Sequence, residues 1–128
     1  MRGDTIDIEA ALVEALGAAG VGASAPPVPA TLGAALPWAH VTRTGGSEAA
    51  YVQDVHRVDI DVYGSTEAAA AQAAGRLCGL VRSLAGSALG GVPCYSASIE
   101  TLPYSNPDPR HPTLPRVTLK AQITTRTA

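Results

Sequence analysis

The residues from Arg57 to Tyr63 alternate strictly between apolar and polar side chains, and this constrains the fold more than any other feature of the chain. Successive side chains of a β-strand point to opposite faces, so strict alternation predicts a strand with one buried face and one polar face. The apolar positions are Val58, Ile60 and Val62, and the polar face carries Arg57, Asp59, Asp61 and Tyr63.

A second strand of the same kind is predicted near the end of the sequence. Its apolar positions are Val117, Leu119, Ala121 and Ile123, and polar residues stand between them. Weaker patterns predict two further strands, over residues 38–44 and 94–102. A loop through residues 45–54 separates the first two strands, so a hairpin is the economical connection between them.

Two segments have the spacing of amphipathic helices. In the first, with Asp4 or Thr5 as N-cap, the apolar face carries Ile8, Ala11, Leu12, Ala15, Leu16 and Ala19. The second begins after Ser65 or Thr66, which are good N-cap residues. Its apolar face carries Ala70, Ala73, Ala74, Leu77, Val81 and Leu84, which predicts close packing on a sheet.

Together these patterns predict one α+β domain over residues 1–128. The expected fold is a four-stranded, mostly antiparallel sheet with both helices on one face, in the order α-β-β-α-β-β. Two long loops are expected, at about 20–37 and 103–115, because both stretches are rich in proline. Long loops in compact domains are usually functional or disordered.

Composition excludes some functions and leaves others open. The net charge is −2 and the pI is about 5.8, which disfavours binding nucleic acid through its phosphates. Cys78 and Cys94 form no CxxC motif, so we expect two reduced thiols. No secretory signal or membrane-length apolar run is visible, so the sequence predicts a soluble protein that is made in the cytoplasm and has no membrane partner.

The residues that could carry chemistry are few. Asp59 and Asp61 could form a metal or acid/base pair, but an open sheet face provides no cleft to separate their pKa values. His40 and His56 could approach each other across the predicted hairpin, yet zinc requires three or four ligands. None of the common catalytic motifs is present. We therefore expect no enzyme activity, no cofactor and no metal.

Three stretches resemble the tail terminator proteins of long non-contractile-tailed phages (siphophages), especially those of actinobacterial hosts. They are the helix "IDIEAALVEAL" (6–16), the strand and helix "HRVDIDVYGSTEAAAAQAAGRL" (56–77) and the ending "PYSNPDPRHPTLPRVTLKAQITTR" (103–126). The resemblance implies an α/β fold of this element order. It also implies a hexameric ring that caps the head-proximal end of the tail tube, stops its polymerisation and provides the head-joining surface.

The resemblance also implies location and partners. The protein would lie in the virion tail, contact the major tail tube protein and the head-tail connector proteins, and meet DNA only as it passes through the lumen. Asp59 and Asp61 would then face either a neighbouring subunit or the lumen. The interface candidates are Arg57, Asp59 and Asp61 on the sheet face, and Tyr104, Asp108, Arg110 and His111 in the proline-rich loop.

Two alternatives remain at this point. One is another phage neck or tail-completion joining protein, because such proteins share small size, acidity and long loops. The other is a small cytosolic ligand-binding or enzymatic α+β domain, with its pocket under the connection from Gly22 to Pro37.

Overall fold

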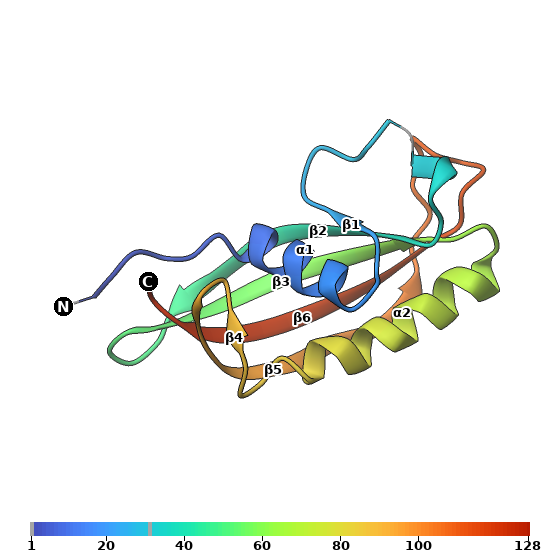
Figure 1. Ribbon diagram of the computed structural model, residues 1–128. Helices are drawn as coiled ribbons and strands as arrows, with labels where there is room; N and C mark the ends of the chain where they lie inside the picture. Colours follow the sequence, from blue (N-terminus) through green and yellow to red (C-terminus); the bar gives the residue numbers. More distant parts are fainter. Residues whose placement is uncertain (1, 31) are drawn as a thin grey trace.

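The computed structural model describes residues 2–30 and 32–128 (Figure 1). It has two α-helices, α1 (Ile8–Ala18) and α2 (Glu67–Arg82), and a short 3-10 turn, η1 (Leu32–Ala34). The strands are β1 (Ala23–Ser24), β2 (Trp38–Glu48), β3 (Gln53–Tyr63), β4 (Ala88–Leu89), β5 (Val92–Ser105) and β6 (Arg116–Arg126). The longest helix has 16 residues, and no helix in the described ranges is long and apolar enough to cross a membrane.

The predicted four-stranded sheet in the order α-β-β-α-β-β is wrong. The six strands form one curled, mixed sheet in the order β1-β2-β3-β6-β5-β4. Both additional strands lie at its edges, where β1 pairs parallel to β2 and β4 pairs antiparallel to β5. Each is two residues long, too short to show any alternation. β1 falls within the long loop predicted at about 20–37, and no strand was predicted at the position of β4.

The four long strands form the centre of the sheet. The expected hairpin of β2 and β3 is present, and β6 inserts between β3 and β5 with antiparallel pairing on both sides. Ile60 lies opposite Leu119 in this register, and Asp59 lies opposite Lys120. The alternating apolar residues of β3 and β6 therefore face the same side, and both polar sets face the other side.

Both helices cover the apolar side of the sheet, so one core joins them to β2, β3 and β6 (Figure 1). Its buried strand residues are Ala39, Val41, Val58, Ile60, Val62, Leu89, Cys94, Val117, Leu119, Ala121 and Ile123. The helices contribute Ile8, Leu12, Leu16, Ala70, Ala74, Leu77 and Val81. A fully buried Val, Leu or Ile contributes roughly 1.5–3 kcal/mol, so this single cluster is the main source of stability.

Side-chain caps set the helix starts. Asp7, rather than Asp4 or Thr5, caps α1, and its Oδ1 accepts a hydrogen bond from Ala10 N at 3.1 Å. Thr66 caps α2, with Oγ1 accepting from Ala69 N at 3.0 Å. These bonds satisfy N–H groups that have no partner inside the helix.

The curl of the sheet brings both of its edges to α1. This helix contacts β1 and β2 on one side and β4 on the other. In the turn after β4, Gly90 has φ +61, and a Cβ there would lie 3.1 Å from Ala11 Cβ. Glycine is therefore needed where this turn closes over the helix. The outcome is a half-barrel filled by helical side chains.

Candidate functional site

The polar side of the sheet carries a ladder of ion pairs across β5, β3 and β6. Arg57 Nε lies 3.4 Å from Glu100 Oε1, and Lys120 Nζ lies 3.2 Å from Asp59 Oδ1. The hydrogen bond to Asp59 raises the pKa of Lys120. The next pair places Arg116 Nη1 3.9 Å from Asp61 Oδ2. We call these six residues the charge ladder.

Within this ladder Asp59 and Asp61 do not form an acid/base pair. Each has a cationic partner, and Asp61 Oδ1 also accepts a 2.6 Å hydrogen bond from Thr118 Oγ1. Partly exposed pairs of this kind contribute about 0–1 kcal/mol to stability. Two of the pairs, Arg57–Glu100 and Lys120–Asp59, therefore matter mainly as a surface pattern of alternating charge, whereas the Arg116–Asp61 pair is mostly buried.

One end of the polar face is covered, so the expectation of an open face without a cleft is wrong. The loop 106–115 folds back over β3, and Tyr63, which alternation places on this face, is fully buried. A cavity of about 560 Å³ remains between this loop and the connection before β2. Its lining comprises Pro26, Pro27, Val28, His40, Thr42, Asp61, Tyr63, Asp108, Arg110, His111 and Arg116.

Asp108 fastens this loop to the sheet. Its Oδ2 accepts a hydrogen bond from the Tyr63 hydroxyl at 2.8 Å and lies 3.0 Å from His111 Nδ1. Its Oδ1 accepts from Arg110 N at 3.0 Å, and Arg116 Nη1 lies 3.7 Å from Oδ2. Both carboxylate oxygens are thus occupied by donors from the protein itself. The geometry is that of a structural tie.

Electrostatics support this role. Burial by itself would raise the pKa of Asp108, but hydrogen bonds from His111, Arg110 N and Tyr63, with the Arg116 charge, hold that pKa well below its usual range. Burial, followed by the hydrogen bond to Asp108, raises the pKa of Tyr63. Asp108 therefore stays ionised and Tyr63 stays neutral at any ordinary pH.

The structure separates the interface candidates into three groups. Arg57, Asp59 and Asp61 belong to the charge ladder. Tyr104 lies in β5, opposite Thr118 of β6, and its side chain is exposed. Arg110 is exposed and His111 is half-buried in the loop. Asp108 is buried, so it is available to the loop and not to a partner.

The histidines considered as a metal pair are far apart. His40 lies opposite Asp61 on the polar side, whereas His56 lies opposite Gly46 and is buried on the helix side. Its Nε2 lies 2.9 Å from Thr125 Oγ1. Burial lowers the pKa of both histidines. No cluster of three or more His, Cys, Asp or Glu side chains suited to a metal occurs in residues 2–30 and 32–128.

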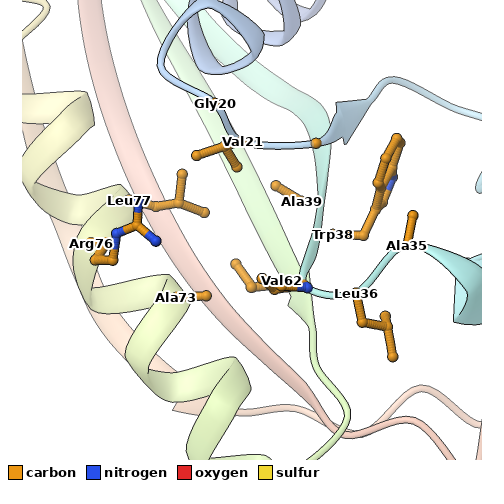
Figure 2. Close-up of a pocket in the computed structure, with 12 residues that line it drawn as sticks. Gly20, Val21, Ala35, Leu36, Trp38, Ala39, Val62, Ala73, Arg76 and Leu77 are labelled. Carbon is orange, nitrogen blue, oxygen red and sulfur yellow. The ribbon is translucent and has the colours of Figure 1, made fainter.

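A second cavity, of about 440 Å³, lies on the helix side (Figure 2). Its lining comprises Gly20, Val21, Gly22, Ala35, Leu36, Pro37, Trp38, Ala39, Val62, Ala73, Arg76 and Leu77. We call it the apolar cavity. It adjoins the connection from Gly22 to Pro37, under which the pocket of the ligand-binding alternative was expected. No sequence pattern indicates that these residues line a cavity, because alanine and leucine on an apolar helix face are typical of any core.

Comparison with known proteins gives a likeness of fold. No protein-family model matches the sequence. No curated protein matches it either. Among solved structures, a chain from the structure described as "Virion of native gene transfer agent (GTA) particle" aligns with a TM-score of 0.57 and 14% identity. The alignment covers 88% of this chain and 84% of that chain, so nearly the whole of both folds is shared.

Proposed function

We propose that this chain is a phage-like virion structural protein. The observation that carries the proposal is the shared fold with a chain of a gene transfer agent virion over 88% of its length. Within that class we propose the tail terminator role. This role is supported by the three stretches that resemble tail terminators of siphophages, residues 6–16, 56–77 and 103–126. In the structure these stretches contain or overlap α1, β3, α2 and β6.

In this role the protein acts by binding and shape and needs no cofactor. A ring of subunits, six by the resemblance, caps the head-proximal end of the tail tube. There it blocks addition of further tube protein and presents a surface to the head-tail connector. A closed ring needs two different patches on each subunit that fit one another.

The charge ladder supports a subunit contact as its location, in preference to the lumen. Its three cations and three anions balance, so it would exert little net repulsion on passing DNA. Alternating charges do set the register between two protein surfaces and disfavour wrong alignments. The exposed Tyr104 and Arg110, near the covered end of the same face, are candidates for contact with the tube or a neighbouring subunit.

Deletion of the gene in the genome that encodes it tests this function. Electron microscopy should then show tail tubes of uncontrolled length without heads, and a plasmid copy should restore tails of uniform length. Tails of normal length that fail to join heads would instead support a neck or joining protein. Normal virions would overturn the virion role altogether.

A complementation experiment tests the loop in the same system. The double variant Tyr104→Ala/Arg110→Ala should keep a nearly unchanged melting temperature, because both side chains are exposed. It should nevertheless fail to restore tail length or head joining. Full rescue by this variant would remove both residues from the contact surface.

A further inference from the structure

One wall of the apolar cavity is held in place by contacts within the single chain. This wall is the Trp38 ring, whose Nε1 donates a 2.9 Å hydrogen bond to Ser24 Oγ. The ring lies directly against Gly22, where an added Cβ would stand 2.7 Å from Trp38 Cε3. Val62 and Leu77 form the floor and the opposite wall (Figure 2). An apolar cavity that opens to water favours an apolar or aromatic occupant.

The size and rim of the cavity restrict that occupant further. A cavity of about 150 Å³ already admits benzene, so about 440 Å³ accommodates an aromatic side chain and its neighbours. Arg76 extends from α2 beside Leu77 towards the cavity (Figure 2). Among the described residues it has no ion-pair partner. An aromatic group accompanied by a carboxylate therefore fits the site.

The chain itself carries such a group. Tyr51, in the turn between β2 and β3, is 93% exposed, more than any other large apolar side chain in the described residues. Its φ of +57 lies in the left-handed region, which non-glycine residues rarely adopt because of steric strain. Glu48, at the end of β2, has a side chain that is 76% exposed although it contacts Arg2. This end of the hairpin thus carries an exposed aromatic ring and, three positions earlier in the chain, an exposed carboxylate.

Tyr51 cannot reach the cavity of its own chain. The cavity includes Trp38, the first residue of β2, and Val62, near the end of β3. The turn that carries Tyr51 joins the opposite ends of these two strands. With 11 residues in each strand, the two features lie roughly 35 Å apart. Complementary patches at opposite ends of one subunit are what a heterologous, ring-forming contact requires.

We infer that the Tyr51 turn of one copy of this chain docks into the apolar cavity of the next copy. The Tyr51 ring packs against Trp38 and Val62, and Glu48 approaches Arg76 at the rim. Burial of the ring, together with the charge pair, offsets the strained backbone of the turn. This inference rests on the proposed ring assembly, and it names the two surfaces that would meet.

Disulfide cross-linking between two variants tests the contact. One variant carries Ala50→Cys, next to Tyr51, and the other carries Ala35→Cys, at the cavity; both alanines are exposed. Cys78 and Cys94 are buried, and burial raises the pKa of both thiols, so they react slowly. One partner carries a mass tag, which identifies a mixed dimer. The mixture should cross-link under mild oxidation at high protein concentration, and neither variant should do so alone.

Matched controls make the result specific. Ala71→Cys lies on the side of α2 away from Ala73 and Leu77, so its cross-linking to Ala50→Cys should be negligible. Adding Tyr51→Ala to the Ala50→Cys variant should reduce the Ala35 cross-link about tenfold, as expected for the loss of an aromatic anchor. Tyr95→Ala, which removes another exposed tyrosine, should leave it unchanged.

Native mass spectrometry of the same samples separates the two proposals. In one outcome, rings form although Ala50→Cys cross-links to Ala35→Cys no more than it does to Ala71→Cys. That result would overturn the docking and leave the ring assembly in place. A persistent monomer without cross-links, even with tail tubes added, would overturn both. A melting shift with phenylacetate in such a monomer would assign the cavity to a small aromatic ligand.

Discussion

The hydroxyl of Tyr63 donates a 2.8 Å hydrogen bond to Asp108 Oδ2 across 45 positions of sequence. This bond joins the end of β3 to the proline-rich loop 106–115 and brings His111 and Arg116 to the same carboxylate. The prolines restrict the loop, and one buried carboxylate then holds it in place. A loop held in this way fixes the backbone at Arg110, which would lower the entropy cost of binding the proposed partner.

Replacing Asp108 by alanine should lower the free energy of unfolding by about 1–3 kcal/mol. The buried Tyr63 hydroxyl would lose its acceptor, and an unsatisfied buried polar group costs about that much. Urea denaturation measures the change. Arg110→Ala is the matched control, because only its backbone N–H contacts Asp108, and its effect should stay within about 0.5 kcal/mol. Equal losses of unfolding free energy in both variants would contradict the role of the Asp108 side chain in holding the loop.

Acidification below neutral pH should destabilise the fold through its buried histidines. Burial, and to a lesser extent the Arg43 charge, lowers the pKa of His56, so the unfolded chain binds a proton more readily than the folded chain. The stabilisation is complete above about pH 6.5, the ordinary histidine value, and is lost as the pH falls through the lowered folded value. His40 acts in the same direction because of its burial.

The variant His56→Gln should therefore show a smaller loss of stability between pH 7.5 and 5.5 than the parent chain. One histidine accounts for at most about 1.4 kcal/mol per pH unit. Urea titrations at three pH values in this range measure the slope. Parallel slopes in the two proteins would assign the acid sensitivity to other groups. Asp108 contributes only at much lower pH, because its pKa is lowered from an already acidic value.

Charge reversal in the ladder should affect assembly more than folding. Arg57→Glu would place a second carboxylate beside Glu100, yet Arg57 is 54% exposed, so the melting temperature should change little. If the proposed ring forms, the variant should need a higher concentration to assemble at low salt, and added salt should reduce the difference by screening. Analytical ultracentrifugation at two ionic strengths measures this. Identical assembly in both proteins would place the ladder outside the subunit contact.

Strict alternation predicted the faces of β3 and β6 residue by residue. Arg57, Asp59 and Asp61 do lie on the side opposite Val58, Ile60 and Val62. Alternation could not predict that Tyr63, on the same polar side, is buried. Its cover comes from a loop more than 40 residues away, and local pattern carries no information on such contacts.

The remaining errors have similar physical causes. β1 and β4 exist because a neighbouring strand offers unpaired backbone groups, which any two residues can satisfy. The apolar cavity depends on how α1, α2 and the 20–37 connection meet. His40 and His56 were candidates for a pair, but the register of β2 and β3 places them on opposite sides of the sheet.

The central place of β6 in the sheet has a consequence for the order of events during synthesis. The β2–β3 hairpin is complete once Tyr63 has left the ribosome. The strand that pairs with the other edge of β3 is β6, which begins only at Arg116. At 5–20 residues per second the stretch between them takes roughly 3–10 s to translate. During that time β3 exposes an unpaired edge and the apolar side chains of Val58, Ile60 and Val62. Such an edge readily pairs with other chains, so the nascent protein is most prone to aggregation in this interval.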